Sequence, residues 1–205
     1  MRLIKILRKH GFFASVGLFF KRFITITYGY KLILEHSLPN INYYKSFSLC
    51  RMTIEDLELI YRLYPEEISS KKYQILKKRI IDINKKEVIP YVVKDADNNI
   101  YGYYHLSFTN TFDSTINTFV QVDKNSAYLF DDYTFRQFRG MGSHSYSILS
   151  RLEQARELGY KNAIVNILKG NKFSEKSYSK FGFKRYVQYI YVHMGPLKKT
   201  FTIRW

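Results

Sequence analysis

Apolar residues recur at the spacing of an α-helix in several stretches of the chain. The clearest is SYSILSRLEQARELGY, whose apolar face consists of Ile148, Leu149, Leu152 and Ala155. Gly159 directly follows this face and is typical of a helix C-terminus. Further helices are predicted over residues 53–64, 70–84 and 172–180, the first of which begins with a T-x-x-D capping box.

Runs rich in Tyr, Val, Ile and Phe predict strands between these helices. VIPYVVK and IYGYYHLSF, joined by the turn DADNN, form a strong hairpin pattern, and NSAYLFDDYTF predicts a buried strand just before the long helix. The order is a strand, two helices, an antiparallel run, and then helix, strand, helix, strand. This order predicts an α+β fold in which helices flank a mixed, mostly antiparallel twisted sheet. The other predicted strands cover residues 45–50, 118–122, 162–168 and 185–194.

The first thirty residues follow a different pattern. Phe12, Val16, Phe19 and Phe23 lie on one helical face between basic clusters, which predicts a basic amphipathic helix. The longest uncharged run is too short to span a bilayer, and no small-residue cleavage site precedes Lys21. Two interpretations stay open: the apolar stripe packs onto the main domain or a second subunit, or it attaches the protein to anionic lipid.

These patterns predict two parts of the chain. We expect a basic amphipathic extension over residues 1–40 and one domain over residues 41–205, because 205 residues suffice for one domain with a proper core. Residues 31–44 are expected to be a linker that leads into the first strand.

Composition narrows the classes of partner. The net charge is +16, from 33 Lys and Arg against 17 Asp and Glu, so nucleic acid, anionic lipid and a polyphosphate cofactor are all candidates. The sequence has no zinc-finger spacing, no RNP-type aromatic motif and no basic region with heptads, so we expect no nucleic-acid partner and no metal. The single cysteine, Cys50, cannot form an intramolecular disulfide, which favours the cytoplasm.

The segment YTFRQFRGMGSH joins the buried strand to the long helix. Gly140 and Gly142 allow backbone amides to approach a ligand closely. The N-terminus of the following helix favours an anion through its unpaired N–H groups and its dipole. The turn is therefore a candidate phosphate site.

This segment resembles the central signature of the GNAT acetyltransferase superfamily, in which an Arg or Gln, two residues, Gly, one residue, and Gly or Ala join a strand to a helix. Here the motif runs from Arg139 to His144, and a competing register starts at Gln137. The spacing from the motif to the family positions downstream of it favours the register that starts at Arg139. The resemblance covers about residues 47–193 and is weak before Ser126. With Arg139 as anchor, family positions coincide with Ala155, Gly159, Tyr160, Asn171, Tyr178, Gly182 and Phe183.

The resemblance implies that the chain binds acetyl-CoA as a co-substrate. The family binds the cofactor pyrophosphate on backbone amides of this turn and pairs the pantetheine arm with the end of the preceding strand. It also implies contacts to the CoA arm from the start of the short helix over residues 172–180. The cofactor residues so implied are Tyr133, Thr134, Arg139, Gly140, Met141, Gly142, Ser143, His144, Asn171 and Ser174.

Three residues are candidates for proton transfer. The resemblance gives Tyr178 the role of general acid that protonates the departing CoA thiolate. Asp131 and Asp132 are candidates for the base that accepts the amine proton, directly or through water, and Asp131 ranks first. Strand alternation places the two carboxylates on opposite faces, so they cannot both touch the substrate. His105 is a weaker acceptor-site candidate, for which a structural role is the alternative.

Two residues depart from the family pattern. His144 replaces a small residue, and its side chain is expected either to crowd the pyrophosphate or to face it as a donor. Arg136 stands where many members have Pro, and it is expected either to reach a cofactor phosphate or to join the basic surface.

The sequence thus predicts an N-acetyltransferase that transfers an acetyl group directly from acetyl-CoA to a primary amine of a small molecule, an amino sugar being one candidate, in a bacterial cytoplasm. The alternative is a GNAT-fold module at a membrane surface that binds CoA without being an active enzyme, with residues 1–30 as its contact to the inner membrane face. The acceptor and the oligomeric state stay open.

Overall fold

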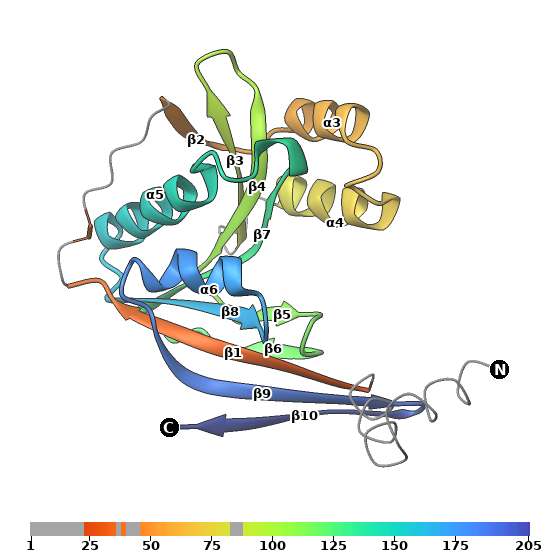
Figure 1. The fold of residues 1–205 in the computed structure, drawn as a ribbon, viewed down its shortest axis with the longest axis vertical. Coiled ribbons are helices and arrows are strands. Elements are labelled where there is room, and N and C mark those ends of the chain that lie inside the picture. Colours follow the sequence, from red (N-terminus) through yellow and green to blue (C-terminus); the bar gives the residue numbers. More distant parts are fainter. Residues whose placement is uncertain (1–22, 36–37, 40–45, 83–87) are drawn as a thin grey trace, which may run out of the picture.

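An eight-stranded sheet organises the chain (Figure 1). The computed structural model describes residues 23–35, 38–39, 46–82 and 88–205. The sheet contains β1 (Ile24–Ile33), β2 (Phe47–Arg51), β3 (Val88–Asp95), β4 (Ile100–Ser107), β7 (Ser126–Thr134), β8 (Asn162–Leu168), β9 (Lys184–Met194) and β10 (Leu197–Arg204). A separate hairpin contains β5 (Thr111–Asp113) and β6 (Thr118–Val120). The helices are α3 (Ile54–Leu63), α4 (Ser70–Ile81), α5 (Ser143–Glu157) and α6 (Lys172–Ser179), with a 3-10 turn η2 (Arg136–Phe138).

The strand order confirms the predicted mixed, mostly antiparallel sheet. It runs β10-β9-β1-β8-β7-β4-β3-β2, and only the central pair β7 and β8 is parallel. The two predicted hairpin strands are β3 and β4. β10, which the sequence did not predict, forms one edge of the sheet.

The central parallel pair opens partway along its length. Pairing between β7 and β8 ends at Leu129 and Val165, although both strands continue beyond that point. There β7 contains a bulge, since its register with β4 shifts between Phe130 and Tyr133 and Asp131 has a φ of 53°. The two halves of the sheet therefore diverge, and Figure 1 shows β7 running away from β8.

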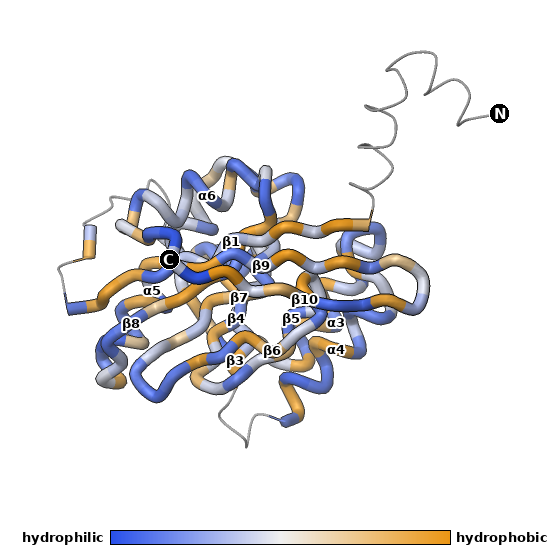
Figure 2. Tube along the Cα trace, turned by 90° about the horizontal axis from the view of Figure 1, so that it is seen from below, coloured by the Kyte–Doolittle hydropathy of each residue, from blue (hydrophilic) through white to orange (hydrophobic). Residues whose placement is uncertain are grey.

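Helices cover the two faces of the sheet separately. On one face, Ile148 and Leu152 of α5 and Tyr178 of α6 pack over the sheet in the largest core cluster. On the other face, α3 and α4 pack over β3 and β4, with Leu57 and Leu76 fully buried. The segment that contains the β5–β6 hairpin packs over residues of β7, β8 and β9 on that second face. Figure 2 shows the hydrophobic residues along the strands that these layers enclose.

Local sequence explains where the helices begin and end. Thr53 and Asp56 form the predicted capping box of α3, in which each side chain bonds the other residue's backbone N–H. Ser69 caps α4. After α5, Gly159 has a φ of 85°, a conformation that ends a helix at low cost only for glycine.

The N-terminal prediction is wrong where it can be compared with the structure. The extension was expected to reach residue 40, with a linker from residue 31, but β1 lies inside the sheet between β8 and β9. Gly29 obscured this strand because glycine weakens a strand pattern. It is needed there, since a Cβ would lie 2.3 Å from Val187 Cγ1. The expected amphipathic helix falls mainly in residues 1–22, outside the described residues.

Candidate active site

The turn between β7 and α5 ends in a helix N-terminus that no side chain caps. Gly140 has a φ of 82° and the N-cap Gly142 a φ of 91°, both in the left-handed region that favours glycine. A Cβ on Gly140 would meet no atom within 4 Å, so the backbone there is open to an approaching group. The amides of Ser143 and His144 begin the helix, and amides in this position favour an anion.

The free side of β7 leads to this turn. The Thr134 carbonyl accepts a hydrogen bond from Arg139 Nε at 3.2 Å, and Thr134 Oγ1 lies 2.9 Å from the Tyr104 hydroxyl. Tyr133 directs its side chain to the other face of the sheet, where its hydroxyl donates to Glu67 at 2.7 Å. Any contact of Tyr133 with a ligand in the opening therefore falls to its backbone.

Asp132 lies at the centre of a buried hydrogen-bond network on the α5 face. Arg151 of α5 is fully buried and holds both carboxylate oxygens, with NH1–Oδ1 and NH2–Oδ2 distances of 2.8 Å. The Tyr178 hydroxyl donates to Oδ2 at 2.7 Å, and His144 Nε2 lies 3.2 Å from the same oxygen. The structure thus brings three sequence-predicted residues, Asp132, His144 and Tyr178, into one cluster.

This network keeps Asp132 ionised and Tyr178 protonated. Burial alone would raise the pKa of Asp132, but the charge of Arg151 and hydrogen bonds from His144 and Arg151 hold it well below its usual range. Burial and the charge of Asp132 raise the pKa of Tyr178 well above that of an ordinary phenol. At neutral pH a protonated phenol therefore donates to a carboxylate. So low a pKa makes Asp132 a weak base, which weighs against its role as acceptor of the amine proton.

The His144 side chain was expected either to crowd the pyrophosphate or to face it as a donor, and its contacts in the structure match neither expectation. Its Nε2 is directed to Asp132, and its ring lies over Tyr104 at a centroid distance of 6.1 Å. The imidazole therefore points into the protein, whereas the backbone amide of His144 belongs to the start of α5.

Asp131 belongs to a second cluster on the α4 face. Its carboxylate accepts from Lys72 Nζ and from Arg79 NH1. Arg79 also donates to His105 Nε2 at 3.1 Å, and His105 Nδ1 donates to the Asp131 carbonyl at 3.2 Å. These three side chains also outweigh burial and lower the pKa of Asp131. The two aspartates therefore face opposite sides of the sheet, as strand alternation predicts.

His105 is a buried structural residue in this arrangement. It is fully inaccessible to solvent, and both of its ring nitrogens have partners. Burial, together with the charge of Arg79, lowers the pKa of His105 to about 3, so the imidazole is neutral at physiological pH. Its role as a direct acceptor-site group finds no support in this geometry.

Most of the remaining predicted residues are exposed, among them Arg139, Met141 and Asn171. Asn171 Oδ1 accepts from the Ser174 amide at 3.2 Å and so caps α6. Tyr178 is near the other end of this helix, seven residues or about 10 Å from Asn171 along its axis. Met141 is 46% exposed, and the Arg136 amide donates to Glu67 at 3.1 Å.

Sequence reasoning missed the residue that organises the Asp132 network. Arg151 lies three positions after Ile148 and four before Ala155, on the apolar face of α5. A charged residue on such a face needs a buried partner, so this spacing was an available signal. Lys72 and Arg79 gave no comparable signal, because basic residues are frequent throughout the chain.

The described part of the chain contains no helix that is long and apolar enough to cross a membrane. In the same residues, no three or more His, Cys, Asp and Glu side chains are grouped so that they could hold a metal ion.

Comparison with known proteins identifies the fold. No protein-family model and no curated protein sequence matches the chain. Among solved structures, it is similar to a GCN5-related glucosamine N-acetyltransferase region of a fungal multi-domain β-N-acetylglucosaminidase, with 11% identity and a TM-score of 0.61 over 86% of this chain and 22% of that one. It is also similar to a tandem GNAT protein from the clavulanic acid biosynthesis pathway, with 14% identity and a TM-score of 0.56 over 88% of this chain and 54% of that one.

A third similar structure carries ligands. Spermidine N-acetyltransferase from Vibrio cholerae, in complex with CoA and spermine, has 18% identity and a TM-score of 0.51 over 67% of this chain and 80% of that one. The chain spans about half or less of the first two matched proteins. At these identities the likeness establishes the architecture: the chain has the fold of the GNAT superfamily, as its glycine turn predicted.

Proposed function

We propose that the chain is an acetyl-CoA-dependent N-acetyltransferase. One observation carries the proposal: the parallel strands β7 and β8 separate after Leu129 and Val165, and the free side of β7 leads to the uncapped N-terminus of α5. An extended ligand arm can pair with the free strand backbone while a terminal anion binds the helix amides. CoA combines an amide-bearing pantetheine arm with a pyrophosphate, so it matches both features.

The cofactor would use mainly backbone groups. The pyrophosphate would bind the amides from Gly140 to His144, and the pantetheine arm would follow Tyr133 and Thr134. Arg139 and Asn171 are exposed and Ser174 is half-buried, and their side chains would contact the rest of CoA. The complex of the Vibrio cholerae enzyme with CoA and spermine supports this choice of ligand for the fold.

The transfer would proceed directly between the two substrates. The amine nitrogen attacks the thioester carbonyl, the carbon–nitrogen bond forms, and the carbon–sulfur bond breaks to release the CoA thiolate. The proton that the nitrogen then loses would replace the one that Tyr178 gives to the thiolate. Tyr178, kept protonated by burial and by Asp132, would redirect its one hydroxyl hydrogen from Asp132 to this sulfur. Asp132 and Arg151 would act as positioning residues for Tyr178.

The acceptor would approach from the α4 face, because the cofactor and Tyr178 occupy the α5 side. There Asp131 is paired with Lys72 and Arg79, and its lowered pKa makes it a weak base. We therefore propose that the amine loses its proton to water before attack. Two cations beside one carboxylate leave net positive charge on this face, which disfavours a polycationic acceptor such as a polyamine. An amino sugar fits better.

A turnover assay tests the proposal. Acetyl-CoA and a panel of amino sugars, polyamines, amino acids and peptides are supplied to full-length protein, and free thiol is measured. Tyr178→Phe should lower kcat by about 100-fold or more, within the range of general acid catalysis. Tyr160→Phe is the matched control, since this tyrosine stacks on Phe108 away from the Asp132 network and should leave turnover unchanged. Absence of turnover with every acceptor would count against the proposed acetyltransferase activity.

The second candidate is a CoA-binding module at a membrane surface that has no transferase activity. Its support is the basic amphipathic sequence that precedes β1, with a peripheral location at the inner face of the membrane. Flotation with anionic liposomes would compare full-length protein with a variant whose Phe12, Val16 and Phe19 are replaced by Ser. Equal flotation of the two proteins would reject a lipid role for this segment.

A further inference from the structure

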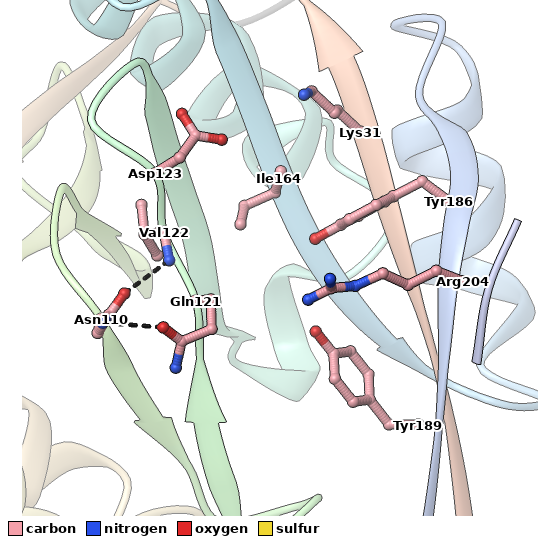
Figure 3. A pocket seen from close by; sticks show the side chains of 9 residues that line it. All are labelled: Lys31, Asn110, Gln121, Val122, Asp123, Ile164, Tyr186, Tyr189 and Arg204. Atoms are coloured by element: carbon pink, nitrogen blue, oxygen red, sulfur yellow. Dashed lines mark hydrogen bonds between the residues drawn. The ribbon is translucent and has the colours of Figure 1, made fainter. Parts of the chain in front are cut away.

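A hollow of about 430 Å³ lies between the β9–β10 side of the sheet and the loops that flank the β5–β6 hairpin (Figure 3). Its volume is within the range of small-molecule sites and is small for CoA. Seven of its nine lining side chains are polar or aromatic, so it suits a polar ligand. The lining residues are Lys31, Asn110, Gln121, Val122, Asp123, Ile164, Tyr186, Tyr189 and Arg204.

Two cations reach this hollow without a carboxylate partner. Among the ion pairs of the described residues, none includes Lys31 or Arg204. The carboxylate on the wall, Asp123, is already used: its Oδ1 accepts from the Asn125 amide and its Oδ2 from the Ser126 hydroxyl, both at 2.9 Å. The charge of Lys31 and Arg204 is therefore available to an anionic ligand.

The neutral side chains of the hollow offer further donors. Asn110 Nδ2 donates to Gln121 Oε1 at 3.1 Å, while Asn110 Oδ1 accepts from the Val122 amide at 2.8 Å. This arrangement occupies the Gln121 oxygen and leaves its Nε2 as a donor. Figure 3 shows the hydroxyl groups of Tyr186 and Tyr189 pointing into the same space as the guanidinium of Arg204.

The hollow is separate from the candidate active site. Ile164 on its floor belongs to the core cluster under the β5–β6 hairpin, whereas Tyr178 lies in the cluster on the opposite face. Along β7, the hollow is at the Ser126 end, five residues or about 17 Å from Asp131. A ligand here would not occupy the opening between β7 and β8.

We propose that this hollow binds a small phosphorylated metabolite of about the size of a sugar phosphate. A phosphate monoester carries close to two negative charges and three acceptor oxygens, which Lys31, Arg204 and a tyrosine hydroxyl can share. The Gln121 amide would donate to the hydroxyl groups of the ligand body. Lys31 and Arg204 both line the hollow, and a guanidinium favours phosphate over a single carboxylate because it presents several donors to several oxygens.

The only tryptophan of the chain, Trp205, adjoins Arg204 and provides the readout. Full-length protein is titrated with glucose 6-phosphate, inorganic phosphate and glucose under selective tryptophan excitation. We expect saturable binding of glucose 6-phosphate, weaker binding of inorganic phosphate and at least tenfold weaker binding of glucose. Lys31→Met and Arg204→Gln should each weaken glucose 6-phosphate binding about tenfold or more, whereas Lys198→Met on exposed β10 should leave it unchanged.

Each outcome of these titrations either supports or overturns the proposed phosphate site in the hollow. Arg204 is exposed on an edge strand, so its variant remains informative if the change at Lys31 impairs folding. A phosphate that bound at the α5 N-terminus would not respond to either variant, and such a result would overturn the proposal. Equal binding of glucose and glucose 6-phosphate would overturn it as well, as would the absence of saturable binding at millimolar ligand.

Discussion

Replacing Arg151 with Met should strongly destabilise the protein. The guanidinium has five N–H donors, and the structure provides an acceptor for each: two Asp132 oxygens, the His105 carbonyl, and the carbonyl and hydroxyl of Ser147. Methionine fills a similar volume but leaves the Asp132 carboxylate buried without its counter-charge. Breaking a buried pair in this way costs about 3 to 5 kcal/mol, a large part of the roughly 5 to 15 kcal/mol that stabilises a domain.

Urea unfolding followed by circular dichroism measures this cost. With a slope of ~2 kcal/mol per molar urea, a loss of about 3 kcal/mol lowers the midpoint by about 1.5 M. Arg156→Met is the matched control, because Arg156 is exposed on the same helix and its replacement should change stability by less than about 1 kcal/mol.

A double variant tests the cause of the effect. Asp132→Asn alone leaves the Arg151 charge buried and unpaired, whereas the variant with both changes contains neither charge. The double variant should therefore lose at least about 1 kcal/mol less than the sum of the two single variants. Additive losses, or a loss below about 1 kcal/mol for Arg151→Met, would refute the reasoning.

Three further predictions rest on other parts of the structure. Gly29→Ala should cost about 1 to 3 kcal/mol in urea unfolding, because the new Cβ meets Val187 Cγ1 at 2.3 Å; an unchanged midpoint would contradict this packing. Stability should fall as pH drops below about 6.5, since the unfolded chain protonates His105 whereas the native pKa is about 3; urea midpoints at about pH 7 and pH 5 should converge in His105→Gln. Asp131→Asn should retain turnover within about tenfold if its carboxylate is not the base, and a loss of about 100-fold or more would restore Asp131 to that role.

Local patterns in the sequence were enough for the helices and for the glycine turn. Capping at Thr53, the apolar face of α5 and the stop at Gly159 depend on neighbouring residues, so each could be predicted from a short segment. The turn at Gly140 and Gly142 could be predicted in the same way, because positive φ values and the start of a helix are local properties.

Features that depend on distant partners were not predictable. β1 is a strand because β8 and β9 enclose it, and its own sequence contains Gly29 in the middle. Asp131 and Asp132 were adjacent candidates for one task, but α4 supplies cations to the first and α5 supplies Arg151 to the second. Their low pKa values come from these contacts, which no spacing along β7 reveals.

The most direct test of the central claim compares CoA with pantetheine, which lacks the pyrophosphate and the 3′-phosphoadenosine, in calorimetric titrations of full-length protein. If the α5 N-terminus binds the pyrophosphate, CoA should bind at least about tenfold more tightly than pantetheine. Gly142→Val should reduce this difference, because valine is strained at a φ of 91° and would displace the amides. Equal affinities for the two ligands, or no binding of CoA at millimolar concentration, would contradict the account.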